Sequence, residues 1–162
     1  MSTRSIIAFG TGLGDCRSTY HHWDGYPAGV GQALYTLYQE RGAEWMERTL
    51  IAEHPSGWSN IVDVDWENTP GFHTYGKGPQ CYCHGERSDG PLDIPSPVPA
   101  GYMGSEWLYL VCSDRTMLIY EALRPKGEHA TGAFGVNPGA QVWQLVATVA
   151  LGGPAPDWEA MR

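Results

Sequence analysis

Short runs of apolar and β-branched residues lie towards both ends of this sequence, a pattern that predicts β-strands. Residues 4–9 are apolar and β-branched, a glycine-rich break follows, and residues 16–23 resume the extended pattern, so we predict a hairpin there. A second hairpin is predicted from residues 106–112 and 116–121, which flank a polar turn. Residues 141–149 predict one further strand.

Apolar positions three and four residues apart predict two helices in the first half of the chain. The first begins near Pro27, whose fixed φ suits a first helical turn, and ends at Gly42, a natural C′ residue. The second covers residues 43–53 and ends before Pro55. The apolar stripe of the first helix consists of Val30, Ala33, Leu34, Leu37 and Tyr38.

The amino-acid composition changes over residues 55–101, which hold seven of the twelve prolines and seven of the twenty-one glycines. This composition predicts a loop-rich insertion. Within it, residues 60–67 alternate in the manner of a half-buried strand, and residues 72–75 and 80–84 are weaker strand candidates. The glycine-containing tail, residues 150–162, is expected to be loose.

Together these elements predict one α+β domain over residues 1–162, an antiparallel sheet of about five or six strands with two helices packed on one face. The sequence is 42% hydrophobic and 12% aromatic, which excludes a disordered chain. No export signal opens it, and no stretch approaches the roughly 18 apolar residues of a spanning helix. We therefore predict a cytoplasmic protein, with free thiols and no membrane partner.

The net charge of −8 argues against direct binding to nucleic acid, because that affinity comes from clustered Lys and Arg. Residues 40–67 hold seven acidic side chains and only two basic ones. This acidic stretch either keeps the protein in solution or mimics nucleic acid towards a basic host protein.

Residues 20–27 form the chemically richest stretch of the chain, and we call residues 20–26 the corner, where a strand meets a helix. Free amides and the helix dipole at such a junction favour an anion, while the rings are suited to stacking and arginine to bidentate contacts. The hypothesis is therefore a binding protein for a small, nucleotide-like anion. The predicted ligand-binding residues are Arg4, Arg17, Tyr20, His22, Trp23, Asp24 and Tyr26.

A purely structural interpretation of the corner is the alternative. Asp24 would cap the helix, Gly25 would make the turn, and the aromatic rings would fill the core. His21 and His22 are neighbours on a strand and point to opposite faces, so only His22, on the side of Tyr20, belongs to a pocket. No nucleophile lies at a recognisable spacing, so we predict no catalytic residue and favour a binding protein over an enzyme.

Cys81-x-Cys83-His84 is the main candidate metal motif, and zinc is the cofactor it would hold. Structural zinc sites usually hold their cysteines as C-x2-4-C pairs in tight turns, and the sequence has no second pair, so ordinary reduced thiols are the favoured interpretation. If the motif forms a strand, His84 points away from the two cysteines. A metal-assisted hydrolase that combines His22 and Asp24 with this motif is the alternative function. The ligand set of the Cys81-x-Cys83-His84 motif would be completed by Cys16, Cys112, His73 or His129.

A second possible cation site is the acidic row Asp63-x-Asp65-x-Glu67, whose oxygens suit Mg²⁺ or Ca²⁺. Same-face residues on a strand are about 7 Å apart, so these carboxylates converge only if the strand bends sharply. In the favoured interpretation, these three carboxylates lie on the solvent-exposed side of an amphipathic strand.

Two blocks of sequence carry a family resemblance: Thr3-Arg4-Ser5-x-Ile7 and Tyr20-x-His22-Trp23-Asp24-Gly25-Tyr26-Pro27-x-x-Val30-Gly31-x-x-Leu34. They resemble a widespread family of short phage and prophage proteins of unknown function, and the 107–120 hairpin resembles its later paired strands. The resemblance implies a phage or mobile-element origin, with a host-takeover or anti-defence role in the host cytoplasm. It implies no particular chemistry. The Cys81-x-Cys83-His84 motif lies outside it.

Overall fold

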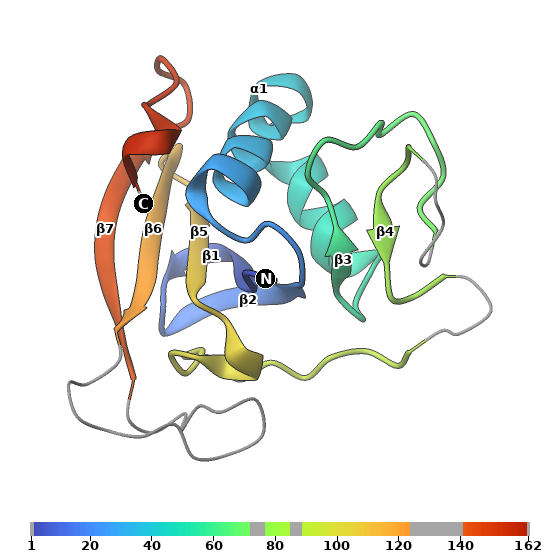
Figure 1. The fold of residues 1–162 in the computed structure, drawn as a ribbon, viewed down its shortest axis with the longest axis horizontal. Coiled ribbons are helices and arrows are strands. Elements are labelled where there is room, and N and C mark those ends of the chain that lie inside the picture. Colours follow the sequence, from blue (N-terminus) through green and yellow to red (C-terminus); the bar gives the residue numbers. More distant parts are fainter. Residues whose placement is uncertain (1, 72–76, 85–88, 124–140, 162) are drawn as a thin grey trace.

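The computed structural model describes residues 2–71, 77–84, 89–123 and 141–161, and these build a seven-stranded mixed sheet. The order across the sheet is β4-β3-β2-β1-β5-β6-β7. Figure 1 shows β4 at one edge, β7 at the other, and α1 lying against the sheet between them. The strands are β1 Ser5–Gly12, β2 Asp15–His21, β3 Trp58–Asn60, β4 Gln80–Cys81, β5 Trp107–Cys112, β6 Thr116–Leu123 and β7 Val142–Ala150.

Both predicted hairpins and the predicted last strand are confirmed. β1 pairs antiparallel with β2, and β5 pairs antiparallel with β6, which in turn pairs antiparallel with β7. In each of the two hairpins, β1–β2 and β5–β6, a short turn brings sequence neighbours together in antiparallel fashion.

The predicted purely antiparallel sheet of five or six strands is wrong. β1 pairs parallel with β5, and β2 pairs parallel with β3. Each parallel pair joins segments separated by a long crossover, and alternation within a strand carries no information about such partners. The fold still combines helix with sheet, but its sheet is larger and mixed.

The prediction of two separate helices is also wrong. A π-helical turn at Pro27–Gly31, α1 at Gln32–Glu47 and a second π-helical turn at Arg48–Ala52 follow one another as a single helical run. The predicted break appears as a kink, because Gly42 has φ 81° and ψ 165° inside α1. No helix in the described part of the chain is both long and apolar enough to span a membrane.

The strand predicted over residues 60–67 does not form. β3 ends at Asn60, and Asp63 has a left-handed φ of 53°. Burial nevertheless alternates as predicted, with Val62 and Trp66 half-buried and Asp63 and Asp65 exposed. The alternation therefore reflects an irregular segment lying on the core rather than a strand. The strand predicted over residues 80–84 is only two residues long, and the candidate at 72–75 lies outside the described residues.

Two hydrophobic cores lie on opposite faces of the sheet. Ile7, Tyr109 and Val111 face the helical run, whereas Ile6 and Leu110 face the segment that precedes β5. That segment contributes Val98 and includes a short 3-10 helix at Tyr102–Gly104, so the last part of the predicted insertion covers a core.

The C-terminal tail differs from the loose segment expected. Leu151 and Trp158 are buried in the core on the helical side, and residues Trp158–Met161 form a 3-10 helix. Tyr35 and Gln39 of α1 donate hydrogen bonds to the carbonyl oxygens of Gly153 and Leu151. The tail is therefore anchored to α1.

Candidate functional site

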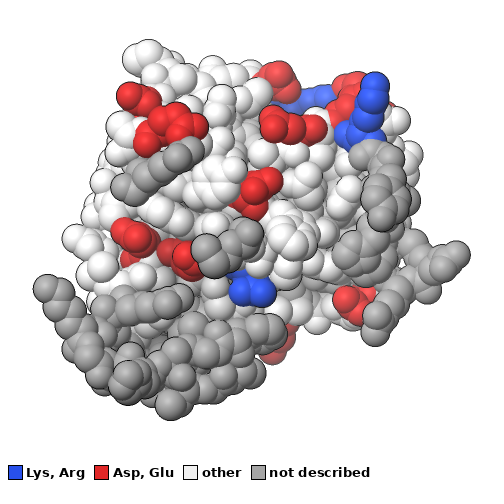
Figure 2. All heavy atoms as spheres, in the orientation of Figure 1, with Lys and Arg blue, Asp and Glu red and all other residues white. Residues whose placement is uncertain are grey.

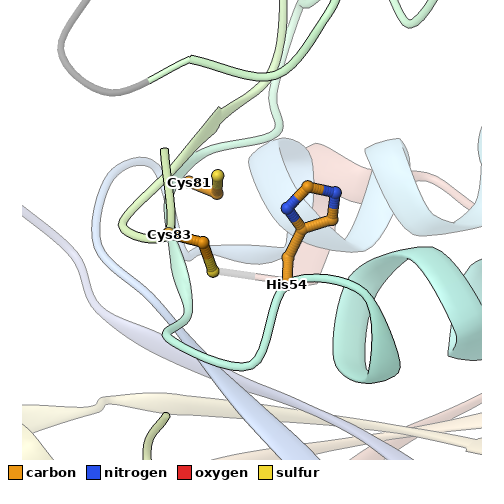
Figure 3. A group of neighbouring side chains, drawn as sticks. All are labelled: His54, Cys81 and Cys83. Atoms are coloured by element: carbon orange, nitrogen blue, oxygen red, sulfur yellow. The ribbon is translucent and has the colours of Figure 1, made fainter. Parts of the chain in front are cut away.

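Three side chains with metal-binding atoms meet where the helical run ends beside β4. His54 follows the π-helical turn that ends at Ala52, Cys81 lies in β4, and Cys83 follows two residues later. The pairing of Trp58 in β3 with Cys81 brings these segments together. The nitrogen and sulfur ligand atoms of His54, Cys81 and Cys83 all lie within 4.8 Å of one another, and Figure 3 shows the two cysteines on one segment with the His54 ring beside them.

The surroundings fix two of these side chains. The imidazole of His54 packs against the indole of Trp58, with ring centroids 4.7 Å apart. The backbone N–H of Ser56 donates a hydrogen bond to the sulfur of Cys83 over 3.3 Å. His54 is buried, and its Nδ1 has no hydrogen-bond partner among the described residues. A buried ring nitrogen without a protein partner costs free energy, and a bound metal ion would remove that cost.

His84 lies beside this cluster. Its Nδ1 is 3.0 Å from the sulfur of Cys81, and its ring centroid is 5.0 Å from that of His54. The strand pattern predicted His84 on the opposite face from the cysteines, and this prediction is wrong, because β4 ends at Cys81 and the chain bends over residues 82–84.

Burial favours the neutral forms of Cys81 and His54. It is the main cause that raises the pKa of the Cys81 thiol above 9.0, and it also lowers the pKa of His54 below 6.5. A neutral imidazole is ready to bind a metal, whereas the thiol must first lose its proton. Metal binding to this cluster therefore releases protons and weakens as the pH falls.

The sequence indicated Cys81, Cys83 and His84 but missed His54, which lies 27 residues before Cys81 and belongs to no ligand motif. Of the predicted completing ligands, Cys16 donates its thiol to the carbonyl of Leu13, and Cys112 to that of Leu110. Neither belongs to the metal-ligand group found in the described residues. His73 and His129 lie outside the described residues.

At the corner, Arg4, Tyr20, His22 and Trp23 lie together. The Tyr20 hydroxyl is 2.8 Å from Nδ1 of His22, and the His22 and Trp23 rings meet edge-on at 4.7 Å. Burial raises the pKa of Tyr20 to about 12, although the neighbouring Arg4 guanidinium acts in the opposite direction. Trp23 is 44% exposed, so the group reaches solvent.

Two amides at the helix start already have backbone partners. The N–H of Gly29 donates to the carbonyl of Tyr26 over 2.9 Å, and that of Val30 to the carbonyl of Asp24 over 3.0 Å. Asp24 thus caps through its backbone, and no side chain caps this helix. Tyr26 packs against the core. These two donors are not open to an anion, and anion binding at the helix start stays a prediction.

Gly25 and Tyr109 hold the corner against the sheet. The N–H of Gly25 donates to the carbonyl of Thr3, and the buried Tyr109 hydroxyl donates to the carbonyl of Gly25, both over 2.8 Å. A Cβ at Gly25 would lie 2.7 Å from the Thr3 oxygen, so only glycine fits. Arg17, in contrast, forms an exposed ion pair with Glu47 at 3.4 Å.

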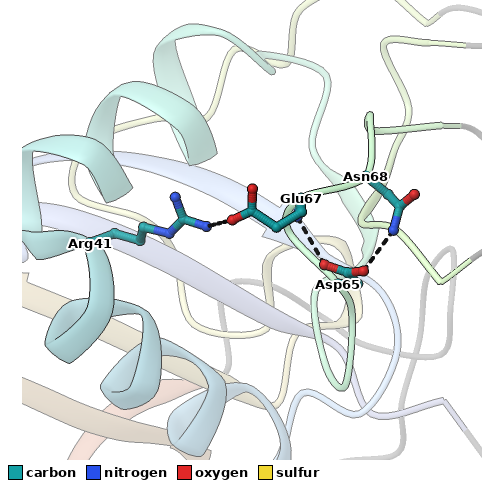
Figure 4. A network of polar contacts seen from close by, with 4 residues as sticks. All are labelled: Arg41, Asp65, Glu67 and Asn68. Carbon is teal, nitrogen blue, oxygen red and sulfur yellow. Dashed lines mark hydrogen bonds and ion pairs between the residues drawn. The ribbon is translucent and has the colours of Figure 1, made fainter.

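The acidic row has local partners. Asp65 accepts hydrogen bonds from the backbone N–H of Glu67 and from the side chain of Asn68, while Glu67 pairs with Arg41, as Figure 4 shows. On the face in Figure 2 the acidic side chains are dispersed among uncharged ones. These contacts fit a solvated surface, as the favoured interpretation held, although the strand that it assumed does not form.

The resemblance to phage proteins stays a prediction, since it has no independent support. No protein family, no curated protein and no solved structure matches this chain.

Proposed function

We propose that this protein binds one zinc ion through His54, Cys81 and Cys83. The observation that carries the proposal is the convergence of one imidazole and two thiols within 4.8 Å. Around a tetrahedral zinc ion, with Zn–S of about 2.3 Å and Zn–N of about 2.0 Å, neighbouring ligand atoms lie roughly 3.5 Å apart. The side chains therefore need to move by only about an ångström.

Thiolate and imidazole together select zinc over magnesium or calcium, which prefer oxygen ligands. The ion would fasten β4 and the loop after it to the end of the helical run. The two strands at this edge of the sheet are short, three residues in β3 and two in β4, so the ion would add a cross-link where the strand ladder has few hydrogen bonds. The geometry therefore supports a structural role for the metal.

The test is metal analysis of the full chain purified without chelator. We expect one zinc per chain in the wild type, and loss of most of it in Cys83→Ser, because thiolate ligands dominate affinity in such sites. Cys112→Ser is the matched control, since Cys112 is a free, half-buried cysteine outside the cluster, and it should keep the zinc. A metal-free wild type that also takes up no added zinc would exclude the proposal.

We also propose, as a second function, that the corner binds a small anion carrying an aromatic ring, such as a nucleotide. The contact group of Arg4, Tyr20, His22 and the exposed Trp23 supports it, because a guanidinium suits a phosphate and an indole suits a base. A phage accessory protein that sequesters a host signalling nucleotide would use such a site. The binding would rest on side chains alone.

AMP titration monitored by tryptophan fluorescence tests this second proposal. Quenching is expected in the wild type. It is also expected in the control variant Arg17→Met, because Arg17 pairs with Glu47 and lies outside the contact group. It should be lost in Arg4→Met and in Trp23→Phe. Equal responses from Arg4→Met and Arg17→Met would show that the corner does not recognise phosphate.

A further inference from the structure

We infer that His84 is the fourth zinc ligand and closes the centre on its solvent side. This inference rests on the proposed zinc binding. It extends that proposal by assigning the coordination position that decides what the metal does. Three protein ligands and an open position characterise catalytic zinc, whereas four protein ligands characterise structural zinc.

His84 is not one of the three residues whose ligand atoms all lie within 4.8 Å of one another, so the inference rests on its position relative to Cys81. The distance of 3.0 Å between His84 Nδ1 and the Cys81 sulfur is close to the roughly 3.5 Å that separates two ligands on one tetrahedral zinc ion. The ring of His84 also lies 5.0 Å from that of His54, centroid to centroid, so both imidazoles border the same space.

Burial distinguishes the four residues. His54 and Cys81 are buried and Cys83 is half-buried, whereas His84 is exposed. Of the four, His84 is thus the side chain most open to solvent. As a ligand it would take the position that a water molecule holds in a catalytic centre. With His84 bound, the centre has the Cys₂His₂ composition of structural zinc sites.

A closed centre argues against the metal-assisted hydrolase considered from the sequence. That hypothesis needs a zinc-bound water, because the lowered pKa of such a water supplies the nucleophile.

Cobalt(II) in place of zinc tests the assignment, because its visible spectrum reports coordination number and added ligands. In the full-length wild type, we expect a four-coordinate spectrum that does not change when azide is added. His84→Ala should still bind one cobalt, with affinity weakened by at least the roughly 10- to 100-fold that losing a second-shell partner costs. Its spectrum should respond to azide, which enters the vacated position.

His84→Cys is the matched rescue variant. It supplies a thiolate at the same place, so its cobalt complex should again ignore azide while showing stronger sulfur-to-metal charge transfer. A role for His84 that is only structural would not produce this pattern. Circular dichroism of each variant checks that the fold is retained.

The outcomes separate the two proposals. A wild-type protein that binds neither cobalt nor zinc rejects the metal centre itself. A wild-type cobalt complex that responds to azide, or a His84→Ala spectrum identical to that of the wild type, leaves the metal centre intact and overturns the assignment of His84.

Discussion

His21 is a fully buried histidine in a structural role, next to a half-buried histidine that faces a candidate site. Its Nε2 accepts a hydrogen bond from the backbone N–H of Ile61 over 3.2 Å, so the proton of the neutral ring is on Nδ1. Burial, with a smaller contribution from His22, lowers the pKa of His21 to about 3. His21 therefore stays neutral in the native state at any pH above that value.

Acid should destabilise the fold through His21. The unfolded chain protonates this side chain near pH 6.5 and the native state only near pH 3, so stability falls as the pH decreases between these values. From pH 7 to 4.5 this residue alone should cost roughly 2 kcal/mol.

Urea denaturation at both pH values, in EDTA to exclude metal effects, measures this loss. His21→Gln keeps an acceptor for Ile61 but cannot titrate, so it should lose roughly 2 kcal/mol less than the wild type between the two pH values. Equal losses would mean that His21 is already charged, or already exposed, in the native state.

At the scale of elements, the helical run shows how one residue changes direction without ending a helix. Gly42 lies inside α1 at φ 81° and ψ 165°, a conformation that side-chain-bearing residues rarely adopt. The kink lets Leu34 and Leu37 before it, and Met46 and Leu50 after it, all reach the same core.

Gly42→Ala should therefore destabilise the protein by about 1–3 kcal/mol, the usual cost of a side chain in such a backbone conformation. Crowding is not the reason, since a Cβ at this position would meet nothing within 4 Å. Gly152→Ala is the matched control, because Gly152 has equal space and no positive φ, and it should change stability by less than about 0.5 kcal/mol. If Gly42→Ala and Gly152→Ala unfold with the same midpoint in urea, the backbone conformation at Gly42 does not penalise a side chain.

At the scale of the whole molecule, the C-terminal tail packs against the start of the helical run. The ring of Trp158 packs edge-on against that of Tyr35, with ring centroids 5.8 Å apart. A Cβ at Gly31 would lie 3.1 Å from the Trp158 ring. The tail thus completes the core that the first helical turns begin.

Trp158→Ala should cost about 3–5 kcal/mol, the usual range for removing a buried tryptophan. Glu159→Ala, an exposed neighbour in the same 3-10 helix, should have little effect. Thermal unfolding followed by circular dichroism compares them, and a Trp158→Ala variant as stable as Glu159→Ala would mean that the tail does not contribute to the core.

The candidate metal site was partly visible in the sequence. Cys81, Cys83 and His84 are adjacent in sequence, so their proximity follows from chain connectivity. His54 could be identified only once β3 had paired with β4, because that pairing sets the helix end beside Cys81.

The sequence by itself determined the two hairpins, the amphipathic helix and the alternation of burial over residues 61–67, because side-chain periodicity and turn residues act over a few neighbouring positions. Only the tertiary structure decided that β1 and β5 run parallel, that the tail closes the core, and that His54 meets the cysteines. Those outcomes depend on which distant surfaces exclude water best when packed together, a choice that the whole chain makes at once.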